Sequence, residues 1–155
     1  MFLEIGQMVK DDHKDYEIID HTADIGLKVY GKNKEELFFN AARGMFFLIT
    51  DTQLTPASNK NRKYYTVNNN ASNIEDLLVA WLSELLFIHA TEFVILDDYE
   101  IHSLTEQMIK SRVGAIKIKG SPYRVVREIK AITYHNLRIF QDKTGRWQAN
   151  IIFDI

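Results

Sequence analysis

The order of the elements that the sequence predicts indicates an α+β fold, a mostly antiparallel β-sheet with two main helices packed on one face. Strand-like segments occupy both ends of the chain, and two segments with apolar residues at helical spacing lie between them. The C-terminal segment has the pattern of a β-hairpin. Strands, a helix, a strand, a helix and a block of strands, in that order, are typical of an α+β domain.

Two strand-like runs precede the first helix. Residues 16–20 form a short β-type run, and residues 25–31 alternate in the manner of a half-buried strand. Asn33 followed by Glu36 has the spacing of a capping box, which predicts that a helix begins here. The apolar residues of this helix share one face: Leu37, Phe38, Ala41, Ala42, Met45, Leu48 and Ile49. Residues 50–56 end it.

The second helix has the clearest pattern. A strand-like run at 63–67 and the turn-prone residues 68–70 come first, and Ser72 with Glu75 then has the spacing of another capping box. The apolar side chains that follow lie along one face: Ile74, Leu77, Leu78, Trp81, Leu82, Leu85 and Ile88. Their burial would contribute on the order of 10–20 kcal/mol before entropy is subtracted, so we expect a core helix.

The pattern predicts strands again from residue 92 onward. Residues 130–140 and 146–155 are the two arms of the C-terminal hairpin, and Gly145 in the turn between them can adopt a positive φ. One face of the returning arm is apolar and carries Trp147, Ala149, Ile151 and Phe153. The opposite face carries Gln148, Asn150, Ile152 and Asp154.

Composition and charge exclude several classes of protein. The chain has 155 residues, 46% of them hydrophobic, a formal net charge of −2 and no cysteine. One domain, residues 15–155, with a flexible N-terminal extension, residues 1–14, is the expected organisation. The missing cysteines exclude disulfides and thiolate metal sites, and they fit a cytoplasmic protein. No apolar run is long enough to span a membrane.

Carboxylates are the best candidates for chemistry. Asp20 and Asp24 lie in the segment DHTADIG between two strands, and Asp154 is the penultimate residue. Such oxygens suit a hard cation, Ca²⁺, Mg²⁺ or Mn²⁺. The pattern alone does not bring residues 24 and 154 together. The simpler interpretation is an Asx turn and a solvated chain end.

The histidines and the basic residues are less specific. The histidines are scattered without a metal-binding spacing: His13, His21, His89, His102 and His135. Seven basic residues and one acid, Glu128, lie between residues 110 and 130: Lys110, Arg112, Lys117, Lys119, Arg124, Arg127 and Lys130. They could form a basic patch for an acidic protein surface or for RNA phosphates, or they could be ordinary solvated strand charges.

Four segments together resemble the archease family. They are DYEIIDHTADIGLKVYG, KEELFFNAARGMFFLITD, IEDLLVAWLSELLFIH and the ending IKAITYHNLRIF…GRWQANIIFDI. The resemblance runs from about residue 15 to residue 155. The motifs HTADIG, KAITYH and a final FD with an aliphatic residue are jointly specific.

The resemblance implies a protein that is not an enzyme. Family members are cofactors of the GTP-dependent, RtcB-type tRNA-splicing RNA ligase, whose guanylylation and multiple turnover they promote. The resemblance also implies a divalent-metal site, whose ligands match Asp24, Asp154 and Ile155 here. The expected ion is Ca²⁺, with Mg²⁺ or Mn²⁺ as alternatives.

Supporting roles are considered for four other residues. Asp20 and His21 would lie beside the metal ligands, and Lys130 and His135 are candidates for contact with the ligase. Neither stable direct nucleic-acid binding nor membrane association is expected, and the oligomeric state is open. Two other functions are considered: a metal-dependent phosphoesterase and a chaperone-like modulator of an RNA methyltransferase.

Overall fold

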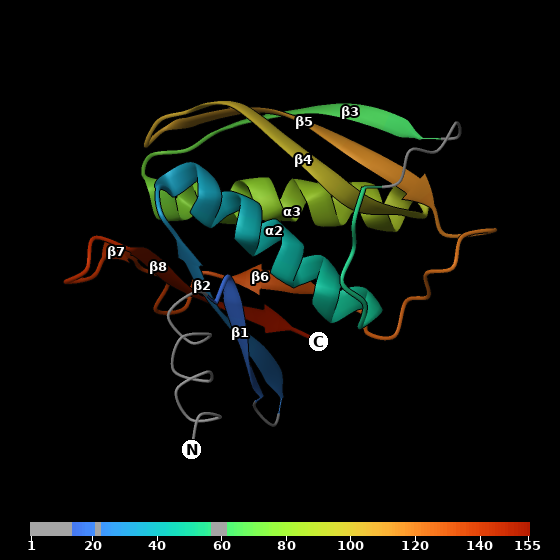
Figure 1. Ribbon diagram of the computed structural model, residues 1–155, viewed down its shortest axis with the longest axis horizontal. Helices are drawn as coiled ribbons and strands as arrows, with labels where there is room; N and C mark the ends of the chain where they lie inside the picture. The colour runs from blue at the N-terminus through green and yellow to red at the C-terminus, as the bar shows by residue number, and fades with distance from the viewer. Residues whose placement is uncertain (1–13, 21–22, 57–61) are drawn as a thin grey trace, which may run out of the picture.

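A computed structural model describes residues 14–20, 23–56 and 62–155, and the structural statements below concern these residues. Two helices lie between two antiparallel sheets (Figure 1). The elements in chain order are β1 (Tyr16–Asp20), β2 (Asp24–Gly31), α2 (Lys34–Thr50), β3 (Lys63–Asn70), α3 (Ile74–Glu92), β4 (Val94–Leu104), β5 (Met108–Lys117), β6 (Ala131–Thr133), β7 (Ile139–Gln141) and β8 (Trp147–Asp154). Within the described ranges, no helix has both the length and the apolar character needed to cross a membrane.

The strands form one sheet of five and one of three. The larger sheet has the order β1-β2-β8-β6, with β7 also paired to β8, and the smaller has the order β3-β5-β4. The α+β class and the antiparallel pairing are therefore confirmed. The arrangement of layers differs from the expected single sheet, because the helices are covered on two sides. In α2, 11 of the 17 residues are buried, which one sheet could not achieve.

Asparagine side chains begin both helices. The Asn33 Oδ1 atom accepts a hydrogen bond from the Glu36 backbone N–H at 2.8 Å, as the spacing predicted. In α3 the cap is Asn73, whose Oδ1 accepts from the Asp76 N–H at 2.8 Å. The expected capping box at Ser72 is therefore wrong by one residue.

The C-terminal hairpin is confirmed, but its outgoing arm is interrupted. Thr133 pairs with Ile152 and Ile139 with Ala149, so five residues, 134–138, face only two on β8, 150 and 151. The excess residues leave the sheet as a loop between β6 and β7, in which Asn136 has a φ of 53°. In the turn, Gly145 has a φ of 88°, as predicted.

Strand β2 packs tightly against α2. A Cβ atom on Gly44 would lie 2.5 Å from a methyl carbon of Leu27, so a larger residue here would force the Leu27 side chain to move. Leu27 is 1% exposed. The contact fixes which face of β2 points into the core and therefore which face carries its polar residues.

Candidate metal centre

The pairing of β2 with β8 brings the two ends of the folded chain together. Ile25 lies opposite Phe153 and Leu27 opposite Ile151, and all four side chains are buried. In the same register Asp24 lies directly opposite Asp154. Because strand side chains alternate, both carboxylates point to the outer face of the five-stranded sheet.

Backbone contacts hold this acidic corner, which we define as Asp24, Asp154 and Ile155, from both sides. Directly opposed side chains in an antiparallel pair have Cβ atoms about 4.5–5.5 Å apart. On the other side of β8, Ala131 lies opposite Asp154, and the Lys130 N–H donates to the Asp154 carbonyl oxygen at 2.7 Å. The side chain of Asp24 is half-buried and that of Asp154 is exposed. Ile155, the last residue, is 38% exposed.

In the part of the chain that the structure describes, no Lys, Arg or His side chain neutralises the acidic corner. There, neither the Asp24 nor the Asp154 carboxylate forms an ion pair or a side-chain hydrogen bond. Like charges directly opposite each other destabilise a sheet, and a divalent cation bound between them would reverse the sign of that interaction. The donor set therefore fits a hard cation.

The donor set is small. Across the described ranges, no group of three or more His, Cys, Asp and Glu side chains is placed to hold a metal ion. The corner offers two side-chain carboxylates and the oxygens of Ile155. A cation bound there would complete its coordination shell with water or with groups from a partner.

The remaining predicted residues lie in different surroundings. Asp20 ends β1 opposite Ile25, and its side chain lies outside the described residues, as does His21. The side chain of Lys130 is exposed, and its backbone N–H is the group that donates to the Asp154 carbonyl oxygen. The assignment of these residues to metal binding or partner contact stays a prediction.

His135 lies beside the acidic corner on the same face of the sheet. It lines a hollow of about 240 Å³ together with Ile19, Gly26 and Ile152. Gly26 is two residues from Asp24 along β2, and Ile152 is two residues from Asp154 along β8. The His135 Nε2 atom lies 3.1 Å from the Asn136 Nδ2 atom, at the loop that interrupts the hairpin.

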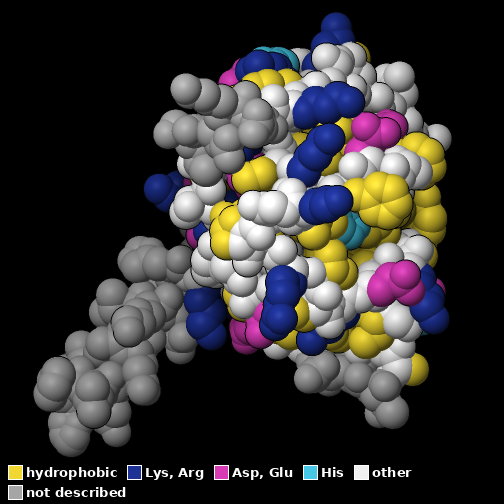
Figure 2. Space-filling view, turned by 90° about the vertical axis from the view of Figure 1, so that its right-hand side faces the viewer, with side chains coloured by type: hydrophobic (Ala, Val, Ile, Leu, Met, Phe, Trp, Pro, Cys, Tyr) yellow, Lys and Arg dark blue, Asp and Glu magenta, His cyan; other side chains and the backbone are white. Residues whose placement is uncertain are grey.

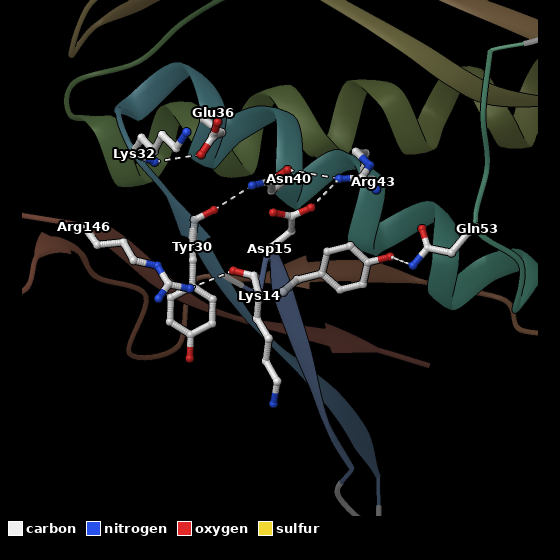
Figure 3. Close-up of polar contacts among 10 residues, drawn as sticks. Lys14, Asp15, Tyr30, Lys32, Glu36, Asn40, Arg43, Gln53 and Arg146 are labelled. Carbon is white, nitrogen blue, oxygen red and sulfur yellow. Dashed lines mark hydrogen bonds and ion pairs between the residues drawn. The ribbon is translucent and has the colours of Figure 1, made fainter. Parts of the chain in front are cut away.

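A network of polar contacts anchors the start of β1 at the far end of β2 (Figure 3). The Arg43 guanidinium pairs with the Asp15 carboxylate at 2.8 Å, and an Arg146 nitrogen donates to the Lys14 carbonyl at 2.7 Å. The guanidinium of Arg146 also stacks over the Tyr30 ring, 4.1 Å from its centroid. These contacts hold β1 against β2.

Sequence reasoning did not find this network. A hollow of about 600 Å³ lies there, lined by Tyr30, Glu36 and Arg146 among others, at the opposite end of β2 from Asp24. Its residues come from the segment before β1, from β2 and α2 and from the hairpin turn, and no local motif joins them. The pairing of β2 with β1 and with β8 brings them together.

Comparison with known proteins shows to which family this chain belongs. The model of the Archease protein family matches residues 16–155. The chain belongs to the archease family. It is 34% identical over 148 residues to the protein archease of Methanosarcina barkeri, covering 92% of this chain and 97% of that protein. The protein archease of Methanothermobacter thermautotrophicus is 36% identical over 147 residues, covering 92% and 99%.

Solved structures agree with this membership. The solution structure of Methanobacterium thermoautotrophicum protein 1598 has a TM-score of 0.67 and 34% identity, with 91% of this chain and 99% of that chain covered. A crystal structure from Thermotoga maritima, described as an archease and possible chaperone, has a TM-score of 0.59 and 22% identity, with coverage of 92% and 99%. At that identity the second likeness supports the archease fold alone.

Proposed function

We propose that this protein is a non-enzymatic activator of a GTP-dependent, RtcB-type RNA ligase in tRNA splicing. It would promote guanylylation of the ligase and multiple turnover through a divalent cation held at the acidic corner. The observation that carries the proposal is the register of β2 and β8, which sets Asp24 opposite Asp154 with no neutralising cation among the described residues. The partner is the one that the resemblance to the archease family implies, and the family model that matches residues 16–155 supports that resemblance.

The chemistry of the corner fits activation better than turnover. Catalysis of hydrolysis would need a nucleophile or base that is oriented by a partner group next to the metal. One described candidate is His135, on the same face of the sheet, and its ring nitrogen contacts an exposed amide. A cation with two protein carboxylates and open coordination positions suits a transient contact with a second protein. Ca²⁺ is the expected ion, and Mg²⁺ and Mn²⁺ are the alternatives.

This chain's own residues would position the ion. Asp24 and Asp154 supply carboxylate oxygens from two adjacent strands, and Ile155 supplies a further oxygen next to them. The ion would supply positive charge that a phosphate or a carboxylate of the ligase can approach. Lys130, whose backbone N–H is bound to Asp154, would add a mobile ammonium group beside that position.

Ligation kinetics test the proposal. We expect the wild-type protein to increase the number of turnovers of an RtcB-type ligase, and Asp24→Ala and Asp154→Ala to abolish the increase while circular dichroism stays unchanged. Glu35→Gln removes one exposed negative charge in the first turn of α2 and is the matched control, which should activate normally. Full stimulation by Asp24→Ala would refute the role of the corner.

A screen of the pure protein separates the enzyme hypothesis from this one. Turnover of phosphate esters or RNA with Mn²⁺ or Mg²⁺, lost on Asp24→Ala, would identify a phosphoesterase instead.

A short peptide added after Ile155 tests the third ligand. Metal affinity measured by calorimetry should fall if the Ile155 carboxylate binds the ion. An unchanged affinity would mean that only the aspartate side chains, or a backbone carbonyl, are ligands.

A further inference from the structure

A groove of about 460 Å³ opens between the end of α3 and the segment 118–130 that joins β5 to β6. Phe93, Ile118, Val125 and Lys130 are among the residues that line it. In Figure 1 these elements form the right-hand side of the molecule, which faces the viewer in Figure 2. The acidic corner and the hollow beside His135 do not include Phe93, Ile118 or Val125, so this is a separate surface.

Phe93 occupies an unusual position at the rim of this groove. It follows the last residue of α3 with φ 55° and ψ 49°, the left-handed conformation in which helices normally place Gly or Asn. For a bulky residue this conformation is a clear outlier. Its side chain is nonetheless 72% exposed, so the core gains little from it. A strained and exposed aromatic residue indicates a role outside the fold.

Val125 and Val126 extend the apolar surface, and hydrogen bonds to the end of α2 anchor their segment. They are 44% and 52% exposed. The Val126 N–H donates to the Ile49 carbonyl at 2.8 Å, and an Arg127 guanidinium nitrogen donates to the Leu48 carbonyl at 2.6 Å. Both bonds cap the end of α2, whose last turn contains no basic residue. The segment that carries the valines is therefore tied to the end of α2.

Positive charges lie along the same face of the molecule as this apolar surface. Figure 2 shows a file of Lys and Arg side chains running down this face beside hydrophobic ones. Lys117, Lys119, Arg124 and Lys130 are all exposed, and within the described ranges none of them forms an ion pair. Arg127 is excluded from the set, because its guanidinium caps α2.

We propose that this docking groove, with Phe93 and Val125 at its rim and Lys119 and Arg124 nearby, binds a protein segment that presents an apolar side chain flanked by Asp or Glu residues. The apolar side chain would fill the groove, and the flanking carboxylates would meet the cations. A large exposed aromatic residue beside a pocket is typical of the centre of an interface.

The same observations disfavour a nucleic acid in the groove. Apart from Phe93 and His89, the side chains that line the groove carry no ring on which bases could stack, so the groove offers no continuous stacking surface. The chain as a whole carries a formal charge of −2. A carboxylate-bearing peptide needs only a few cations beside an apolar pocket, which is what this surface provides.

This inference rests on the proposed function, because the ligase is the partner used to test it. Lys130 lines the groove with its side chain and binds Asp154 with its backbone, so one partner could span groove and acidic corner. The groove and the acidic corner would then have different roles. The groove sets the affinity for the partner, and the corner sets what happens once the partner is bound.

Three variants separate these roles. Phe93→Asn places at this position a residue that tolerates the left-handed conformation. We expect its melting temperature to stay the same or to rise by about 2–4 °C, whereas its Kd for the ligase rises about tenfold or more. Lys119→Glu with Arg124→Glu should raise the Kd about tenfold as well, by charge repulsion. Lys110→Glu with Lys143→Glu makes the same change of net charge at the start of β5 and in the β7–β8 turn, and should bind normally.

Activation at saturating concentration is the second measurement. The groove variants should still stimulate ligation fully when enough protein is added, whereas Asp24→Ala should not stimulate at any concentration. Unchanged Kd values for both groove variants, with normal activation by the wild-type protein, would overturn the groove and leave the proposed function. A drop in the melting temperature of Phe93→Asn by more than about 4 °C would assign Phe93 to the fold instead.

A peptide probe tests the groove independently of the ligase, which covers the case that the ligase is not the partner. Amide NMR of the full chain is followed while a 12-residue peptide of alternating leucines and glutamates is added, and oligo(U) RNA is added to a second sample. We expect the peptide to shift the amides of residues 86–93 and 118–130 in the wild-type protein and not in Phe93→Asn. No shift with the peptide, or shifts of these residues with oligo(U) alone, would overturn the proposal even if the ligase is not the partner.

Discussion

The two sheets of this protein differ in whether their carboxylates are paired with a cation of the same chain. In the three-stranded sheet the Asp97 side chain is completely buried, and two nitrogens of Arg62 donate to its oxygens at 2.5 and 3.1 Å. In the five-stranded sheet Asp24 and Asp154 face each other near the surface, and no described cation pairs with either. The first carboxylate is satisfied within the chain, and the other two are not.

The local backbone explains the buried pair. The register of β4 against β5 passes from Leu96 directly to Asp98, so Asp97 is the extra residue of a β-bulge, which can aim its side chain inward. Arg62 immediately precedes β3 and reaches it there. The hydrogen bonds to Asp97 raise the pKa of the Arg62 guanidinium, which therefore stays charged. The buried Asp97 carboxylate is thus neutralised by a cation of the same chain. The carboxylates of the acidic corner have no such described partner and are available to an ion from solution.

The largest effect is expected from breaking the buried pair. Asp97→Ala leaves the Arg62 guanidinium buried without its counter-ion, and we expect a loss of about 3–5 kcal/mol in the free energy of unfolding. Urea unfolding measures it. Replacing both partners, as Asp97→Leu with Arg62→Met, should recover much of the loss. A loss below about 1 kcal/mol for the single variant would show that water replaces the missing partner.

The next largest effect on stability is expected from the proposed metal ion. An ion that binds only the folded chain stabilises it by about 2.7 kcal/mol at a hundred times its Kd. We therefore expect Ca²⁺ to raise the melting temperature of the wild-type protein and of Asp97→Ala, and to leave Asp154→Asn unchanged. Chelation with EDTA should reverse the shift. Equal shifts in wild type and Asp154→Asn would place the ion elsewhere.

The contrast between the two sheets also shows what the sequence could predict. The helices were predictable because apolar side chains at a spacing of three and four continue over several turns in α2 and α3. The cap of α3 was misplaced because Ser72 and Asn73 are both good caps, and only the observed bond to the Asp76 N–H decides between them. The division into two sheets depends on long-range pairing, which periodicity does not report.

The site was predictable in part. Resemblance to a family singled out residues 24 and 154, whereas the pattern around them is equally typical of a turn and a chain end. Their opposition follows from the register of β2 and β8, which no local signal encodes. Nothing in the sequence pointed to Phe93, because its left-handed conformation is visible only where α3 ends and β4 begins.

A smaller effect of opposite sign tests whether the corner is strained without metal. Asp24→Asn removes one of two like charges that face each other across the strands, and such repulsion is worth about 0.2–1 kcal/mol. In EDTA we expect this variant to be slightly more stable than the wild-type protein, as measured by urea unfolding. At high salt, screening should make the two equal. A loss of stability in EDTA would mean that the Asp24 carboxylate already has a partner.

The smallest effect concerns a fourth carboxylate, Asp142, which is satisfied without any cation. Asp142, in the β7–β8 turn, accepts hydrogen bonds from the Thr144 hydroxyl at 2.6 Å, the Gln148 amide at 2.7 Å and the Thr144 and Arg146 backbone N–H groups at 2.8 and 3.1 Å. These bonds lower its pKa from 3.8 to about 2. Because the folded pKa is the lower one, the ionised form favours the folded turn above pH 3.8, and that contribution is lost as the pH falls toward 2.

Amide NMR of the turn checks this pH dependence directly. The Thr144 and Arg146 amide shifts should titrate with a midpoint of about 2, and Asp142→Asn should make them independent of pH in that range. A midpoint near 3.8 would mean that the hydrogen bonds do not hold the ionised form. Such a result would also weaken the contrast with the acidic corner, because hydrogen bonds from neutral donors would then not be enough to satisfy an exposed carboxylate of this chain.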